Sequence, residues 1–294
     1  ANSVVCNNKG RKVKKLWTDG STGEKVELIE TADSKIEADE IVKKIKEEVF
    51  RNKRVFRDFA ILYRTNAQSR ALEASLKRSG MAYTIVGGVR FYDRKEIKDI
   101  LAYLRLITNV KDDLSCKRVI NVPLRGIGAK TIQRLENEAR KRDVSLFEVL
   151  TFLDEIEDIS PARKKKINGF KRLIDKYISL REEVYPNELI HTLIDETGLL
   201  LLYKEDTSIE GQSRAENIKE FINAAGEYVT AHPEEATLAG FLENVSLVTD
   251  TDQWDDSSNA ITLMTLHSAK GLEFPVVFIT GLEEGLFPVF RSLD

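Results

Sequence analysis

Two short apolar runs flank a polar loop near the end of the chain, and they constrain the fold more than any other feature. The runs are residues 261–266 and 276–280. Because their apolar residues are continuous rather than alternating, each run predicts a strand covered on both faces, as in a parallel sheet. Ligands of open α/β sheets bind beyond the carboxyl ends of the strands, so the loop between the runs predicts a binding site.

Strand and helix patterns also alternate over the first hundred residues, which predicts an α/β fold with a largely parallel sheet. The predicted strands are residues 26–30, 59–63 and 83–86, and the predicted helices are residues 35–50, 66–79 and 94–108. From about residue 109 to residue 248 only helical periodicity is found, and residues 249–259 are polar and acidic. We therefore expect an all-α domain (109–258) inserted into a discontinuous α/β domain (1–108 and 259–294).

Composition narrows the class of protein without deciding its partner. The chain has 294 residues, enough for two domains, and its net charge is −3. A negative charge argues weakly against nucleic acid, but a basic stripe on an acidic body would still bind it. Cys6 and Cys116 have no partner spacing, so we expect reduced thiols, no metal site and a cytoplasmic protein. Neither a signal peptide nor a membrane span is predicted.

Three stretches resemble superfamily 1 DNA helicases of the PcrA/UvrD/Rep type. TLHSAKGLEFPVVF (265–278) resembles motif V of that family, and residues 59–70 and 86–105 resemble its second RecA-like motor domain, which a helical insertion interrupts. The resemblance covers nearly the whole chain and is strongest in residues 59–134 and 260–288. The simpler alternative for residues 265–278 is a polar loop that joins two core strands.

The resemblance implies roles for the loop after residue 264. Glu273 would bind the ribose hydroxyls of ATP, because a carboxylate accepts from both of them. Lys270 and Gly271 would lie at the same nucleotide, with Lys270 reaching a phosphate or coupling the two sites. Thr265 and His267 would contact single-stranded DNA.

Arg64, Asn66 and Arg70 follow a predicted strand and open a predicted helix. Backbone N–H groups at a helix start favour anions, so these residues suit a phosphate. We assign Arg64 and Asn66 to the single strand. The alternative for Arg64 and Arg70 is a solvated helix start.

Arg90, Phe91 and Tyr92 place a cation beside two aromatic rings. Such a surface suits single-stranded nucleic acid, because bases stack on aromatic rings. We assign Arg90 and Phe91 to the single strand. The alternative for the rings is core packing.

Residues 120–134 resemble a helix-hairpin-helix element, in which a glycine turn presents backbone N–H groups to a DNA phosphate. Gly126, Gly128, Lys130 and Thr131 are the candidate duplex contacts, and an ordinary turn between helices is the alternative. The basic clusters 140–142 and 163–166 are either solvated helix faces or non-specific phosphate contacts.

The resemblance implies the second half of an ATP-dependent DNA helicase that moves 3′ to 5′ on a single strand and unwinds duplex in DNA repair or replication. The sequence has no phosphate loop and no aspartate pair for Mg²⁺, which in this family belong to the first motor domain. We therefore expect that domain to precede Ala1 and this chain alone to be inactive. The alternatives are a non-catalytic DNA-binding or regulatory module with a RecA-like fold, and the helicase arm of a helicase–nuclease.

Two segments are predicted to act as hinges for the helical insertion. They are residues 108–112, where the helical pattern ends, and residues 249–259, which hold few large apolar side chains. Such segments bury little surface and can absorb backbone rotation.

Overall fold

The computed structural model describes residues 23–250 and 259–287. Residues 23–31 form neither helix nor strand, and the side chain of Val26 is 99% exposed. The strand predicted for residues 26–30 is therefore wrong. An extended segment becomes a strand only by pairing its backbone with a neighbour, and none of the described strand pairs includes these residues.

Four strands form a sheet in the order β2-β3-β1-β4. They are β1 (Phe59–Tyr63), β2 (Tyr83–Val86), β3 (Ile261–Thr265) and β4 (Val276–Ile279). Every pair is parallel, with Tyr63 opposite Thr265 and Val86 opposite Met264. The α/β fold with a parallel sheet is confirmed, and strands from before and after the predicted insertion pair directly.

One face of the sheet is covered by α2 (Ser34–Asn52) and α3 (Ser69–Arg78), which bury their apolar side chains against β1 and β3. On the other face, Leu266 and Phe274 pack over the centre of the sheet. Val277 and Ile279 of the edge strand β4 remain 45% and 48% exposed. Coverage of both faces, predicted for both apolar runs, therefore holds at the centre and fails at this edge.

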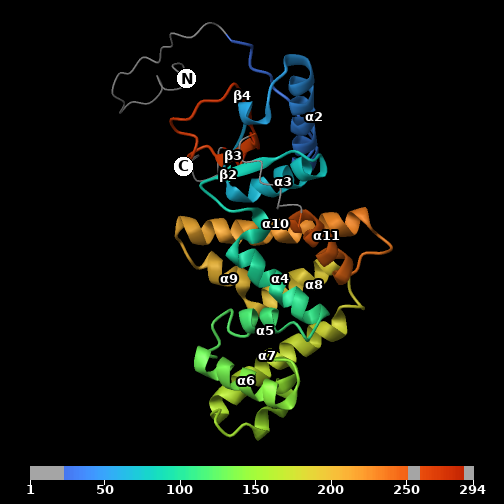
Figure 1. The fold of residues 1–294 in the computed structure, drawn as a ribbon, viewed down its shortest axis with the longest axis vertical. Helices are drawn as coiled ribbons and strands as arrows, with labels where there is room; N and C mark the ends of the chain where they lie inside the picture. The colour runs from blue at the N-terminus through green and yellow to red at the C-terminus, as the bar shows by residue number, and fades with distance from the viewer. Residues whose placement is uncertain (1–22, 251–258, 288–294) are drawn as a thin grey trace. The chain divides into compact units, whose positions relative to one another are not determined.

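A single apolar core joins the helices of residues 91–250, which we call the helical region. Its helices are α4 (Lys95–Thr108), α5 (Asp113–Val119), α6 (Ala129–Arg142), α7 (Pro161–Leu180), α8 (Pro186–Thr197), α9 (Leu199–Lys204), α10 (Ile209–Ala231) and α11 (Leu238–Asp250), and the 3₁₀ helices of the described chain are η1 (Phe56–Asp58), η2 (Asn66–Gln68), η3 (Phe91–Asp93) and η4 (Glu148–Glu155). No strand interrupts the described residues between β2 and β3, so the predicted all-α character is confirmed. Helix α10 lies beside α4, as Figure 1 shows, and it also contacts η2.

Helix α4 belongs to the core of the helical region, since Ile97, Leu101 and Leu104 are buried there. The boundary between the apolar core of the sheet and the apolar core of the helical region therefore lies between Val86 and Phe91. The domain boundaries at residues 108 and 258 stay a prediction. Helix α11 extends through Asp250, so the polar segment begins later than predicted, and residues 251–258 lie outside the described residues. No described helix is long and apolar enough to cross a membrane.

Candidate functional site

The carboxyl ends of β1 and β3 bring together two side chains that are 203 residues apart. Tyr63 and Thr265 end the two strands in register, and the N–H of Leu266 donates to the Tyr63 carbonyl at 2.9 Å. Just beyond, Nη1 of Arg64 lies 3.0 Å from Nδ1 and 3.1 Å from Nε2 of His267. Because a guanidinium only donates, the ring nitrogen that it meets must accept. Arg64 and His267, both predicted to bind single-stranded DNA, are thus in direct contact.

The loop after β2 reaches the same place. Gly87 has φ +74°, and a Cβ there would lie 3.2 Å from Oγ of Ser268. Oγ1 of Thr265 lies 2.9 Å from that Ser268 hydroxyl and accepts from the Ser268 N–H at 3.2 Å. The Thr265 hydroxyl therefore orders the turn that carries His267. We call this junction of residues 64–68, 87–90 and 265–271 the carboxyl edge.

Three further residues are predicted to contact single-stranded DNA. Asn66 and Arg90 are half-buried, and the ring of Phe91 is buried. Asn66 begins η2 beside the glycine turn that follows β2, and the Arg90 guanidinium lies 5.8 Å from the ring centroid of Tyr83. Phe91 is fully buried in edge contact with Tyr92, with centroids 5.2 Å apart. This burial favours core packing for Phe91, because a base could not stack on an enclosed ring.

The loop after β3 presents the residues predicted for the nucleotide. Lys270, Gly271 and Glu273 are exposed, and Gly271 has φ +86°, which favours glycine. Neither Lys270 nor Glu273 makes an ion pair with a described residue. Leu266 and Phe274 pack against the sheet on either side of them. The loop is thus anchored by its apolar ends while its charged groups face solvent.

The glycine turn predicted for duplex DNA lies between α5 and α6. Gly126 has φ +75°, and Gly128 is the N-cap residue of α6. The Asn121 side chain accepts from the N–H of Arg125 at 2.9 Å and of Ile127 at 3.0 Å. The turn is therefore held in shape by internal hydrogen bonds.

The outer side of this turn carries positive charge. Lys130 is exposed, whereas Thr131 is only 3% exposed and cannot offer its side chain to a ligand. A Cβ at Gly126 would lie 2.9 Å from Nζ of Lys166, so the second basic cluster reaches the glycine turn. Within the described chain, the N–H groups of Gly128 and Lys130 have no hydrogen-bond acceptor.

The two basic clusters behave differently. In residues 140–142, Lys141 and Arg142 both pair with Glu138, at 3.1 Å and 3.0 Å. Lys166 has no ion-pair partner in the part of the chain that the structure describes. The first cluster is thus an ion-paired helix face, whereas Lys166 is available to a phosphate.

Arg70 is neither a solvated helix start nor an anion site, so both interpretations of it are wrong. Its side chain is 8% exposed, with Nε 2.5 Å from Glu220 and Nη2 2.7 Å from Glu227, both on α10. Burial alone would lower the pKa of Arg70, but the two carboxylates raise it overall. Arg70 instead attaches α3 to the helical region.

A buried hydrogen-bond network continues this junction. Arg94 donates to Oγ of Ser69 at 2.7 Å and to Asn217 at 2.8 Å, and Asn217 donates to Glu96 at 2.6 Å. Ser69 donates to Glu73 at 2.7 Å. Burial raises the pKa of Glu73, although its hydrogen bond to Ser69 and the charge of Arg94 oppose the shift.

Sequence reasoning missed two residues that adjoin Arg64. Oε1 of Gln68 accepts from the N–H of Arg64 at 2.9 Å and of Thr65 at 2.8 Å. The spacing of Thr65 and Gln68 is that of a capping box, which could have identified Gln68. Glu216 of α10 also faces this loop. Burial raises its pKa, against the charges of Lys219 and Arg64. No local signal marks Glu216.

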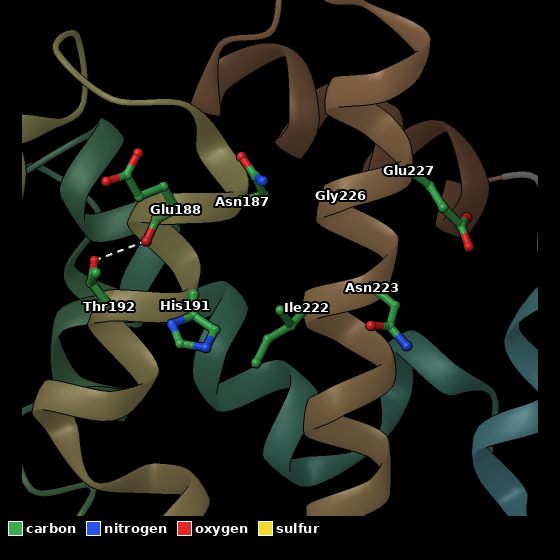
Figure 2. Close-up of a pocket in the computed structure, with 8 residues that line it drawn as sticks. All are labelled: Asn187, Glu188, His191, Thr192, Ile222, Asn223, Gly226 and Glu227. Carbon is green, nitrogen blue, oxygen red and sulfur yellow. Dashed lines mark hydrogen bonds between the residues drawn. The ribbon is translucent and has the colours of Figure 1, made fainter.

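A surface groove of about 570 Å³ lies between α8 and α10 (Figure 2). His191 and Ile222 border the groove, and Glu227, another of its lining residues, also pairs with Arg70. The groove contains none of the predicted site residues. We assign no chemistry to it.

Comparisons with known proteins identify the family of this chain. The whole chain, residues 1–294, matches the family model described as the UvrD-like helicase C-terminal domain. It is 43% identical over 294 residues to the ATP-dependent DNA helicase PcrA of Staphylococcus aureus and 43% identical over 299 residues to that of Bacillus subtilis. All of this chain is aligned in both cases, and it spans 40% of the length of these relatives.

Proposed function

The chain belongs to the UvrD-like helicase C-terminal domain family, and from this premise we propose that it is the second half of an ATP-dependent DNA helicase. It would move 3′ to 5′ on single-stranded DNA and unwind duplex during repair or replication. The rest of the protein would supply the first motor domain. By itself this chain would not hydrolyse ATP.

The contact between Arg64 and His267 carries the proposal. A cation and an imidazole lie together at the carboxyl ends of two neighbouring parallel strands, where α/β sheets bind ligands. A DNA phosphate would be drawn to the guanidinium, which can bind it with two N–H groups. Thr265, Asn66 and Arg90 would extend this contact along the strand. We leave Phe91 out, because its ring is buried.

The loop after β3 fits one side of a nucleotide. The Glu273 carboxylate is exposed and can accept from two ribose hydroxyls, and Lys270 can reach a phosphate. Gly271 lets the backbone turn between them. Among the described residues no three His, Cys, Asp or Glu side chains come together. We assign the metal to the rest of the protein.

The glycine turn between α5 and α6 is the proposed duplex contact. A phosphate would bind the N–H groups of Gly128 and Lys130 and the side chains of Lys130 and Lys166. Thr131 would act only through its buried packing. Backbone and lysine contacts do not read bases, so this contact would not depend on DNA sequence.

Binding of single-stranded DNA by the full-length protein tests this proposal. Arg64→Ala and His267→Ala should each weaken binding of a fluorescent oligo-dT by about tenfold, the effect of roughly 1.4 kcal/mol. Lys43→Ala, which removes an exposed lysine of α2, is the control. If both site variants bind the oligonucleotide with parental affinity, the carboxyl edge does not contact single-stranded DNA. ATP turnover stimulated by DNA separates a helicase from a non-catalytic binding module.

A further inference from the structure

The backbone pairing of β1 with β4 ends just before Arg64, the first residue of the loop proposed to contact single-stranded DNA. The N–H of Thr280 still donates to the carbonyl of Leu62, at 3.0 Å. Gly281 then takes φ +66°, which turns the chain away from β1. The register of the pair would next set Arg64 opposite Gly281. The Arg64 N–H bonds to a side chain instead.

That side chain is Gln68, which occupies the space between the two strand ends. Its Oε1 accepts from the N–H groups of Arg64 and Thr65, at 2.9 Å and 2.8 Å. Its Nε2 lies so close to Gly281 that a Cβ there would overlap it. The N–H of Gly281 donates to Glu37 of α2 at 2.9 Å. The amide of Gln68 therefore replaces the missing rung of the sheet.

We infer that Gln68 is a positioning residue for the DNA strand, which holds the backbone at Arg64 so that the guanidinium meets His267. This inference rests on the proposed single-strand site. Without the Gln68 oxygen, two adjacent half-buried N–H groups would lose their acceptor, which favours other conformations of the loop. The Arg64 side chain would then start from a variable position.

Gln68→Met keeps nearly the same length and removes both polar groups, whereas Gln68→Glu keeps an acceptor. Hydrogen exchange of the full-length protein should accelerate about tenfold at Arg64 and Thr65 in Gln68→Met, as expected for one lost hydrogen bond. Gln68→Glu should retain the protection. Gln133→Met, at an exposed position of α6, is the matched control. Unchanged exchange in Gln68→Met would overturn the inference without touching the proposed function.

Oligo-dT affinity tests the link to DNA. Gln68→Met should weaken binding in the parent background and add nothing to Arg64→Ala, because residues that act through one another are not additive. Fully additive losses would contradict a role through Arg64. If Arg64→Ala binds like the parent, the single-strand proposal and the DNA role of Gln68 both fall. Exchange at Arg64 would still decide separately whether Gln68 holds the loop.

Discussion

Arg70 of α3 and Glu227 of α10, which are 157 residues apart in the chain, form a bidentate ion pair. Nη2 lies 2.7 Å from Oε1, and Nη1 lies 3.1 Å from Oε2. Arg70 also donates through Nε to Glu220. At this point charged side chains attach the helical region to the α3 side of the sheet. The strength of the attachment should therefore depend on those charges.

Arg70→Met should lower the free energy of unfolding by about 2 kcal/mol, less than for a fully buried pair because Glu227 is 44% exposed. The substitution leaves two carboxylates facing each other without a cation. Urea unfolding measures the change. Arg78→Met, on the same helix but 52% exposed, should change stability by less than about 0.5 kcal/mol. Equal losses in both variants would contradict a special role for Arg70.

Glu216 gives a pH dependence with a definite sign. Burial raises its pKa in the folded state, so the folded protein binds the proton more tightly than the unfolded chain. Its charged form therefore costs stability above the folded pKa, and that cost fades as the pH falls toward the unfolded value of 4.5. Because Glu216 is exposed and solvent screens most of this effect, Glu216→Gln should be only slightly more stable than the parent at pH 7.5, and the difference should shrink by pH 5. Urea unfolding at both pH values would reveal a constant difference if another group were responsible.

Sequence periodicity predicts elements well here because each depends on neighbours in the chain. β1 is five apolar residues in a row and is buried throughout. Arg70 could not be placed in the same way, since its partners lie 150 and 157 residues away. Phe91 is similar, because the helices that enclose its ring come later in the chain. Arg64 and His267 were predicted separately, and only the pairing of β1 with β3 brings them into contact.

Glu273→Ala should weaken nucleotide binding in the full-length protein by about 1.5–3 kcal/mol, the value of a hydrogen bond to a charged group. The side chain is exposed, so the fold should be unaffected. Titration with a fluorescent ATP analogue measures the affinity. Glu243→Ala, at an exposed position of α11, is the control. Parental affinity in Glu273→Ala would make Glu273 an ordinary surface residue.

Lys130→Ala and Lys166→Ala should each weaken binding to a forked duplex and leave oligo-dT binding nearly unchanged. Each should also reduce the slope of log affinity against log salt by about one, because one phosphate contact is lost. Gly128→Val should have the same selective effect, since its side chain would project where the phosphate binds. Lys141→Ala is the control, because Lys141 already pairs with Glu138. Equal losses on both substrates would indicate a folding defect instead.

The helical region should change orientation relative to the sheet when the Arg70 pair is weakened. Fluorophores at positions 136 on α6 and 43 on α2 report the distance between the two parts. Salt screens ion pairs that are partly exposed, so high salt should redistribute the distances in the parent. Arg70→Met should show the redistributed distances at low salt. One narrow distance in both proteins, with no response to forked DNA, would show a rigid unit.

The packing of the helical region predicts which residues act as the hinge for that change in orientation. The hinge predicted at residues 108–112 is braced, because Nη1 of Arg181 donates to the carbonyls of Ile107 and Thr108 at 2.9 Å and 3.2 Å. Helix α4 packs within the core of the helical region, so it should move together with that core. We therefore expect rotation at the exposed Gly87–Gly88 turn, which comes before α4. Hydrogen exchange during the salt shift should then change in residues 87–90 and stay constant in residues 105–112. The reverse pattern would return the hinge to residues 108–112.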